Sequence, residues 1–165
     1  EELDRLGWHT TLKQRKDGLL HTNWTGRFTP VCRKPLFIVD GAHNADAANK
    51  MAESIRHYFH GKKLIYIMGV FADKEYNIVL EKTAHYAEKI YTIETPDNPR
   101  ALPAEELAKA ARVYNSSAES TVSIKDAVEK AFAYAGDDEN SVILAFGSLS
   151  FIGELTRIVE EKCKK

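Results

Sequence analysis

The side chains best suited to chemistry in this chain stand in short polar segments, each directly after an apolar run. Together they supply carboxylate, imidazole, ammonium, guanidinium and hydroxyl groups, which the apolar runs do not require. The four segments are Asp40–Asn44, Gly69–Lys74, Thr95–Arg100 and Gly147–Ser150. If the apolar runs are parallel strands of one sheet, their carboxyl ends meet at one edge, where open α/β sheets bind ligands. We therefore expect a ligand site at this edge.

The apolar runs have the length and β-branched content of strands, and helix-like runs lie between them. The expected strands are Leu36–Val39, Lys63–Val70, Lys89–Glu94, a short one near Ser120–Val122, and Ser141–Phe146, with a proline-limited edge strand at Phe28–Arg33. The expected helices are Ala45–Phe59, Glu75–Ala87, Ala104–Val113, Ile124–Ala135 and Leu149–Lys162. This alternation predicts a doubly wound α/β fold. Its sheet is mostly parallel, six-stranded and Rossmann-like, with one antiparallel edge strand and helices on both faces.

The first polar segment also has a structural interpretation. Asp40 or Asn44 could cap the helix that follows, because both side chains accept hydrogen bonds from free backbone N–H groups. His43, taken alone, is more often a structural histidine than a catalytic one. These alternatives stay open at the level of the sequence.

The other segments have structural alternatives too. Asp73 could cap its own helix. Arg100 could be a surface charge or a partner of Glu105 or Glu106. Ser148 could be an N-cap after a tight turn. The expectation of a site therefore rests on all four segments meeting, and not on any one of them.

Several common signatures are missing from the sequence. It has no G-x-x-x-x-G-K-[S/T] phosphate loop, no G-x-G-x-x-G after the first parallel strand and no G-x-S-x-G nucleophile elbow. A phosphorylation receiver would place a lysine after the last strand, where this chain has Gly-Ser. The net charge of −1 argues against a nucleic-acid binder. No apolar run approaches the roughly 20 residues of a membrane-spanning helix.

The two cysteines, Cys32 and Cys163, lie far apart in sequence and have no metal-ligand spacing. We expect reduced thiols in a cytoplasmic protein rather than a disulfide, and we expect no metal site in this chain. Residues 3–21 show a loose helical pattern interrupted by glycines. We expect them to form one or two terminal helices outside the sheet.

Five segments occur in an order that resembles one family. They are W-T-G-R at Trp24–Arg27, D-G-A-H-N at Asp40–Asn44, D-K at Asp73–Lys74, P-D-N-P-R-A-L at Pro96–Leu102 and F-G-S-L at Phe146–Leu149. Over nearly its whole length the chain resembles the C-terminal domain of folylpolyglutamate synthase/dihydrofolate synthase, in the Mur ligase superfamily. D-G-A-H-N followed by F-G-S-L is the specific part of the match, and Thr25 stands where the family has proline.

The resemblance implies an ATP-dependent amide ligase, in which a substrate carboxylate accepts the γ-phosphoryl group of ATP, L-glutamate attacks and phosphate leaves. In this family the phosphate loop and most Mg²⁺ ligands belong to an N-terminal ATPase domain. It follows that residues 1–22 are a linker and tail of that domain and residues 23–165 are the Mur ligase C-terminal (glutamate ligase) domain, inactive when isolated. The implied partners are L-glutamate, folate or dihydropteroate, and the covalently linked ATPase domain, with no nucleic acid and no membrane.

Carried over position by position, the resemblance gives the candidate side chains expected roles. A guanidinium can pair with phosphate oxygens and a carboxylate can accept from ribose hydroxyls, whereas an imidazole and a hydroxyl suit the carboxylates of glutamate. His43 is also the candidate general base, although the ammonium group of glutamate could lose its proton elsewhere. The expected ATP contacts are Arg27, Asp40 and Asn44; the expected glutamate contacts are His43 and Ser148; and contacts in the cleft without a fixed role are Asp73, Lys74 and Arg100.

Two other interpretations remain open at this stage. The chain could be the C-terminal domain of a cell-wall Mur peptide ligase, although those members more often carry D-D-Y-A-H-type turns. It could also be a free-standing α/β ligand-binding module without catalysis. Dihydrofolate synthase and folylpolyglutamate synthase activities are not distinguished, because pterin-contacting residues would lie upstream.

Overall fold

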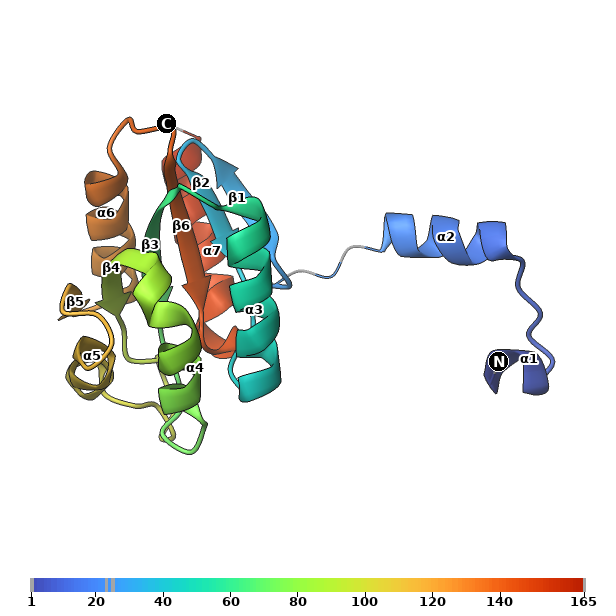
Figure 1. The fold of residues 1–165 in the computed structure, drawn as a ribbon, viewed down its shortest axis with the longest axis horizontal. Helices are drawn as coiled ribbons and strands as arrows, with labels where there is room; N and C mark the ends of the chain where they lie inside the picture. Colours follow the sequence, from blue (N-terminus) through green and yellow to red (C-terminus); the bar gives the residue numbers. More distant parts are fainter. Residues whose placement is uncertain (1, 23, 25, 165) are drawn as a thin grey trace.

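A six-stranded sheet organises the fold in the computed structural model, which describes residues 2–22, 24 and 26–164 (Figure 1). The strands lie in the order β1-β2-β6-β3-β4-β5. They are β1 (Thr29–Arg33), β2 (Leu36–Val39), β3 (Lys63–Met68), β4 (Ala87–Thr92), β5 (Ala118–Ser120) and β6 (Ser141–Phe146). β1 pairs with β2 antiparallel, and the other described strand pairs are parallel. The predicted mostly parallel sheet with one antiparallel edge strand is confirmed.

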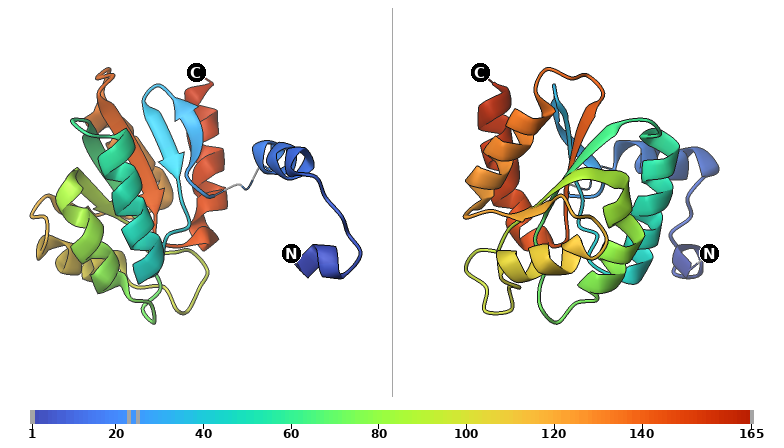
Figure 2. Two further views of the ribbon diagram at one scale, coloured as in Figure 1. Left: turned by 45° about the vertical axis from the view of Figure 1, so that its right-hand side comes forward. Right: turned by 60° about the vertical axis from the view of Figure 1, so that its left-hand side comes forward.

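Helices cover both faces of the sheet (Figures 1 and 2). They are α3 (Ala45–Tyr58), α4 (Tyr76–Thr83), the 3₁₀ helix η1 (Ala84–Tyr86), α5 (Ala104–Arg112), α6 (Ile124–Ala135) and α7 (Leu149–Cys163). One hydrophobic cluster joins α3, α4 and α5 to one face, and a second joins α6 and α7 to the other. Neighbouring residues of β6 enter different clusters, since Leu144 lies in the first and Ile143 in the second. The doubly wound arrangement is therefore confirmed as well.

The central strands end at the same level of the sheet. All six residues of β6 are buried, and β6 pairs with β2 on one side and β3 on the other. Backbone hydrogen bonds continue past the strand ends, from Gly69 N–H to Phe146 O (3.3 Å) and from Ile93 N–H to Met68 O (2.8 Å). The polar segments after these strands therefore leave the sheet side by side.

The helix predicted over Glu75–Ala87 is shorter in the structure. α4 ends at Thr83, η1 follows, and β4 begins at Ala87. The side-chain amide of Asn115 donates to the carbonyls of Ala84 (2.9 Å) and Ala87 (2.6 Å). The turn between α5 and β5 therefore satisfies these carbonyls, and the chain enters the strand instead of continuing as a helix.

The short strand predicted near Ser120–Val122 lies two residues earlier. Val122 is 94% exposed, and its N–H donates to Asp126 Oδ2 at 3.2 Å. Val122 therefore belongs to the cap of α6, whose N-cap Ser123 accepts the Asp126 N–H, and not to the sheet.

The N-terminal residues form an arm that extends away from the sheet domain (Figures 1 and 2). It holds α1 (Glu2–Arg5) and α2 (Leu12–His21). A capping box begins α2, because Thr11 Oγ1 accepts the Gln14 N–H at 3.2 Å and the Gln14 side chain accepts the Thr11 N–H at 2.8 Å. The predicted terminal helices outside the sheet are confirmed.

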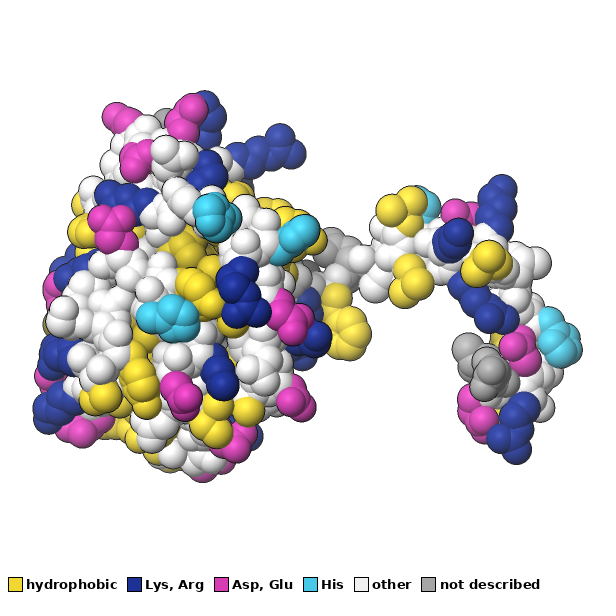
Figure 3. Space-filling model, viewed as in Figure 1, with side chains coloured by type: hydrophobic (Ala, Val, Ile, Leu, Met, Phe, Trp, Pro, Cys, Tyr) yellow, Lys and Arg dark blue, Asp and Glu magenta, His cyan; other side chains and the backbone are white. Residues whose placement is uncertain are grey.

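The apolar side chains of α2 are exposed, and no other described residue of the chain covers them. Leu12, Leu19 and Leu20 are 68%, 77% and 79% exposed, and hydrophobic groups show on the arm in Figure 3. Asn23, and Thr25 where the family has proline, lie outside the described residues. Packing among the residues that the structure describes therefore does not account for the apolar residues of the helix.

The expectation of two reduced cysteines is wrong in this structure, which joins Cys32 and Cys163 by a disulfide with the Cα atoms 6.1 Å apart. The two residues are 131 positions apart in sequence, but α7 packs on β1 and brings its last residue beside Cys32. Cys32 is only 7% exposed, in the edge strand. Separation along the chain did not reveal this proximity.

The surface carries charges of both signs. On the face shown in Figure 3, Lys and Arg side chains are interspersed with Asp and Glu side chains, in keeping with the net charge of −1. Among the helices that the structure describes, none has the length and apolar character needed to cross a membrane.

Candidate ligand site at the carboxyl ends of the strands

A cavity of about 280 Å³ lies at the carboxyl ends of the parallel strands. Each of the four polar segments contributes to it: His43 after β2, Lys74 after β3, Arg100 after β4 and Ser148 after β6. The predicted convergence is confirmed. The described residues that complete the lining are Phe71, Gly147, Leu149 and Ser150. Because Lys74 and Arg100 are cations and no described lining residue carries a carboxylate, the cavity is suited to an anionic ligand.

His43 is oriented by its own loop. Its Nδ1 lies 2.7 Å from the Gly41 carbonyl oxygen, and the ring is partly buried. A carbonyl only accepts hydrogen bonds, so Nδ1 must carry the proton. In the neutral ring Nε2 is then the acceptor, able to receive a hydrogen bond from an ammonium group or water.

Ser148 is the N-cap of α7, so the structural alternative for this residue is confirmed. Its Oγ accepts the Ser150 N–H at 3.3 Å and lies 2.7 Å from Ser150 Oγ. The turn before it requires glycine, because Gly147 has φ +117° and a Cβ there would meet the carbonyl oxygen of Gly69. This turn brings two hydroxyls to a helix N-terminus, where the helix dipole favours an anion.

Arg100 pairs with Asp73, and not with Glu105 or Glu106. Asp73 Oδ1 accepts from Nε at 3.2 Å and Oδ2 accepts from Nη2 at 2.5 Å. The guanidinium hydrogen bond lowers the pKa of the Asp73 carboxyl below its usual range, so the pair is ionised at neutral pH. Asp73 is also not a cap, since the N-cap of α4 is Glu75.

The three expected ATP contacts, Arg27, Asp40 and Asn44, do not line this cavity. Asp40 Oδ2 accepts the Phe28 N–H and Oδ1 accepts the Ala42 N–H, both at 2.7 Å. The carboxylate thus ties the turn that carries Arg27 to the loop after β2. Asn44 is the N-cap of α3, as the structural alternative predicted.

Arg27 remains accessible for binding. Its side chain is exposed, and its guanidinium carbon lies 5.9 Å from the centre of the Trp24 ring. An exposed guanidinium next to a braced turn fits a phosphate group. The residues on this side of the sheet edge are therefore compatible with a nucleotide.

Phe71 and Leu149 lie in two of the polar segments and also line the cavity, although neither was a predicted site residue. The guanidinium carbon of Arg100 lies 4.8 Å from the centre of the Phe71 ring. Leu149 packs so closely over Gly41 that a Cβ there would lie 2.6 Å from its side chain. Apolar residues next to strand ends look like core residues in a sequence, so only the geometry shows their position in the site.

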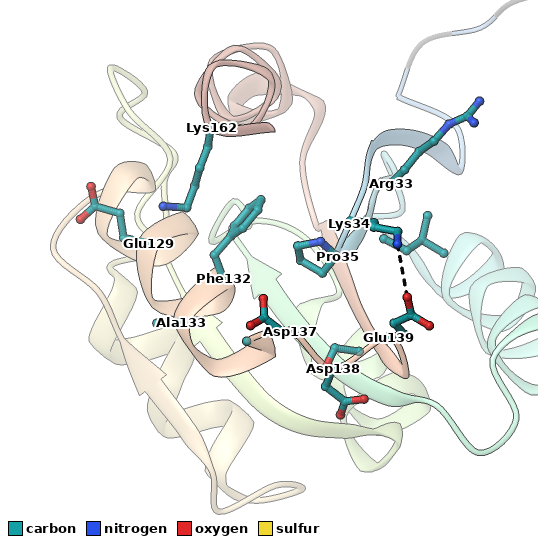
Figure 4. Close-up of a pocket in the computed structure, with 13 residues that line it drawn as sticks. Arg33, Lys34, Pro35, Glu129, Phe132, Ala133, Asp137, Asp138, Glu139 and Lys162 are labelled. Atoms are coloured by element: carbon teal, nitrogen blue, oxygen red, sulfur yellow. Dashed lines mark hydrogen bonds and ion pairs between the residues drawn. The ribbon is translucent and has the colours of Figure 1, made fainter. Parts of the chain in front are cut away.

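A larger cavity, of about 1010 Å³, lies at the other end of the sheet (Figure 4). Its lining includes Leu36 and Ser141, the first residues of β2 and β6. Charges of both signs surround it, and Lys34 pairs with Glu139 at 3.3 Å. Because open α/β sheets bind ligands at the carboxyl ends of their strands, we place the candidate site in the smaller cavity.

The chain is an α/β domain with an open, mostly parallel sheet and a cavity at the carboxyl edge that is a candidate site for a small anionic ligand. The family model described as "Mur ligase, glutamate ligase domain" matches residues 26–149. The chain belongs to this family, and the resemblance noted in its motifs is confirmed.

The chain is similar in sequence to known proteins. The folylpolyglutamate synthase of Lacticaseibacillus casei is 30% identical over 96 residues, which cover 58% of this chain and 22% of the relative. The dihydrofolate synthase/folylpolyglutamate synthase of Bacillus subtilis (strain 168) is 28% identical over 149 residues, which cover 90% of this chain and 34% of the relative. The chain therefore spans only a minor part of both relatives.

A solved structure has the same fold. It is a bifunctional folylpolyglutamate synthase/dihydrofolate synthase with Mn, AMPPNP and L-glutamate bound. The TM-score is 0.79 at 22% sequence identity, and the match covers 95% of this chain and 37% of that chain. At this identity the likeness shows the fold alone.

Proposed function

We propose that this chain is the glutamate-binding domain of an ATP-dependent ligase that joins L-glutamate to folate or dihydropteroate through an amide bond. The observation that carries the proposal is the cavity where four strand ends bring together an imidazole, an ammonium, a guanidinium and a hydroxyl. The names of the relatives support the same chemistry. L-Glutamate, with two carboxylates and one ammonium group, is complementary to this lining.

In the proposed site each polar group binds one part of glutamate. Lys74 and Arg100 bind one carboxylate as cations. The hydroxyl of Ser148, at the N-terminus of α7, binds the other. His43 accepts a hydrogen bond from the amino group through Nε2 and takes its proton as the amine attacks. The bond from Nδ1–H to the Gly41 carbonyl holds the ring in the orientation that this step needs.

We also propose that Arg27, Asp40 and Asn44 contact ATP where an N-terminal domain closes on this one. Each carboxylate oxygen of Asp40 accepts one backbone N–H and keeps a lone pair that can accept from a ribose hydroxyl. ATP supplies the phosphoryl group that activates the folate carboxylate as an acyl phosphate, with Mg²⁺ as its counterion. Within the described part of the chain no group of three or more His, Cys, Asp or Glu side chains could hold a metal ion. The proposal therefore assigns the Mg²⁺ ligands mainly to the N-terminal domain.

The proposal assigns residues 1–22 to the linker and tail of that N-terminal ATPase domain. The exposed leucines of α2 support it, since an apolar helix face is normally covered by another surface.

The proposal also places the enzyme in the cytoplasm, a compartment that keeps thiols reduced. The stability of the fold without the Cys32–Cys163 bond is therefore an important quantity to measure.

The test is ADP release by the full-length polypeptide, with and without L-glutamate and a reduced folate. Release should need both substrates and the upstream region, and this chain alone should release none. Replacing the reduced folate by dihydropteroate then tells whether dihydrofolate synthase activity is present. Turnover of a cell-wall precursor instead of folate would refute the folate proposal, and no turnover of either would refute the ligase proposal.

Substitutions in the same assay test the site. His43→Ala and Ser148→Ala should each raise the KM for L-glutamate about tenfold or more, because a hydrogen bond to a charged group is worth about 1.5–3 kcal/mol. Asp40→Ala should raise the KM for ATP. It also leaves the Phe28 and Ala42 N–H groups unpaired, so its Tm must be measured beside its kinetics. Wild-type glutamate kinetics in both His43→Ala and Ser148→Ala would refute the site assignment.

A further inference from the structure

Two loops that follow neighbouring strands are joined to each other beside the cavity. The loop after β3 and the loop after β4 meet in an isolated antiparallel bridge. Two backbone hydrogen bonds flank it, from Ala72 N–H to Arg100 O (2.8 Å) and from Leu102 N–H to Val70 O (3.0 Å). The backbone at Arg100 is therefore fixed relative to the loop that carries Asp73 and Lys74.

The side chain of Arg100 is held from two directions. Asp73 accepts hydrogen bonds from Nε and Nη2, which occupy one edge of the planar guanidinium. The ring of Phe71 lies 4.8 Å from the guanidinium carbon, at the distance of a cation–π contact. Asp73 does not bind the Nη1 group of Arg100, which can therefore donate to a ligand. Arg100 and Phe71 both line the cavity.

We propose that Asp73 and Phe71 are positioning residues, which fix Arg100 so that its Nη1 group binds a carboxylate of the incoming amino acid. The inference rests on the proposed function and assigns roles within its site. Asp73 does not touch the substrate; it acts through Arg100. Lys74, next to Asp73 in the chain, offsets the Asp73 charge, so Asp73, Lys74 and Arg100 together carry a net positive charge toward the ligand.

Stability does not explain this arrangement. The side chains of Arg100 and Asp73 are 51% and 52% exposed, and ion pairs exposed to this degree add little to folding stability. Orientation does explain it, because a long side chain that is already held loses less rotamer freedom when it binds a ligand. The pair therefore matters for the affinity of the site.

The experiment measures the KM for L-glutamate, the KM for ATP and kcat in the full-length enzyme. Asp73→Asn should raise the glutamate KM about tenfold, the size expected when a charged hydrogen-bond partner is lost, and leave the ATP KM unchanged. Asp73→Glu should restore most of the affinity, and Phe71→Leu should raise the KM a few-fold. Glu161→Gln is the matched control, since it removes the carboxylate of an exposed pair with Arg157 on α7 (3.0 Å) and should change nothing.

A double-mutant cycle decides whether Asp73 acts through Arg100. Asp73→Asn combined with Arg100→Ala should be no worse than Arg100→Ala alone, because the guanidinium to be positioned is then absent. Additive defects would overturn the positioning role while leaving the ligase proposal intact. So would a wild-type glutamate KM in Asp73→Asn. An enzyme with no dependence on L-glutamate would instead refute the proposed function itself.

A spectroscopic measurement on this chain guards against a folding defect. The ¹⁵N–¹H resonance of Arg100 Nε, assigned by its loss in Arg100→Lys, should shift in Asp73→Asn, while the backbone amide spectrum stays that of the wild type. If the backbone spectrum of Asp73→Asn changed, and its kcat fell equally whether L-glutamate or ATP was varied, Asp73 would have a structural role. That result would overturn the proposal. An unshifted Nε resonance would show that Asp73 does not hold Arg100.

Discussion

The Cys32–Cys163 disulfide should contribute a large share of the stability of this chain. It links residues 131 positions apart, and the loop that it closes contains nearly the whole sheet and leaves the N-terminal arm outside. By the chain-entropy relation, a crosslink over a loop of this length is worth about 5 kcal/mol, and measured disulfides typically give about 2–4 kcal/mol. Domains unfold with only about 5–15 kcal/mol, so we expect reduction to remove about 2–5 kcal/mol of a small total.

The local effect of reduction should appear at one edge of the sheet. Cys32 lies in β1, which has β2 as its strand partner, and Cys163 is the last residue of α7, which packs on β1. Without the disulfide, β1 is held by its hydrogen bonds to β2 and by side-chain contacts. The last turn of α7 is then held by side-chain contacts. Amide exchange should therefore accelerate there more than in β6, where every residue is buried.

The assay is urea unfolding followed by far-UV circular dichroism, with and without reductant. Tryptophan fluorescence is unsuitable, since Trp8 and Trp24 are each 70% exposed and precede the crosslinked loop. A Cys32→Ala/Cys163→Ala variant should match the reduced wild type and be insensitive to reductant. Equal unfolding free energies for oxidised and reduced protein, within about 0.5 kcal/mol, would refute the reasoning, as would two free thiols in the purified chain under non-reducing conditions.

Two further predictions concern stability. Gly147→Ala should destabilise the chain by about 3 kcal/mol in urea unfolding, because its φ is +117° and the new Cβ would meet the Gly69 carbonyl oxygen; Gly153→Ala in α7, where a Cβ meets nothing within 4 Å, is the matched control and should stabilise by about 0.5–1 kcal/mol. Hydrogen bonds from two lysine ammonium groups lower the pKa of Glu119 to about 2. The ionised Glu119 carboxylate stabilises the fold fully above its pKa in the unfolded chain, and this stability is lost as pH falls from about 4.5 toward 2. We expect a loss of about 1 kcal/mol, because the side chain is 43% exposed. Thermal unfolding at these pH values should show that the Tm of Glu119→Gln depends less on pH than that of the wild type. The same pH dependence of Tm in both proteins would contradict the prediction.

The sheet could be predicted from the sequence because its central strands are buried on both faces. Leu36–Val39 and Ser141–Phe146 are found with the predicted bounds, since an unbroken apolar run between polar residues has few other uses. The ends of α4 and the position of β5 were predicted less well. They depend on the side chains of Asn115 and Asp126, which satisfy backbone groups of the helix end and of the cap. Such contacts are set by tertiary structure, and periodicity does not encode them.

The candidate site was predictable in its location but not in its pairings. Because parallel strands end at one edge of a sheet, the sequence predicts that His43 and Ser148 lie close together, and both line the same cavity. The partner of Arg100 was not predictable, because Glu105 and Glu106 are nearer in sequence than Asp73. The disulfide was not predicted either, because its two cysteines are 131 positions apart in the sequence. Local spacing identifies elements and their ends, whereas partners across loops depend on how the elements pack.

The loop Asp40–Asn44 connects the two halves of the proposed site. At one end the Asp40 carboxylate binds the turn that carries Arg27, through the Phe28 N–H, and also the Ala42 N–H within the loop. At the other end Nδ1 of His43 lies 2.7 Å from the Gly41 carbonyl oxygen, and Asn44 is the N-cap of α3. Hydrogen bonds of the Asp40, His43 and Asn44 side chains thus hold the loop between β2 and α3. If Asp40 contacts ATP and His43 contacts glutamate, this single turn sets the spacing between one contact of each substrate.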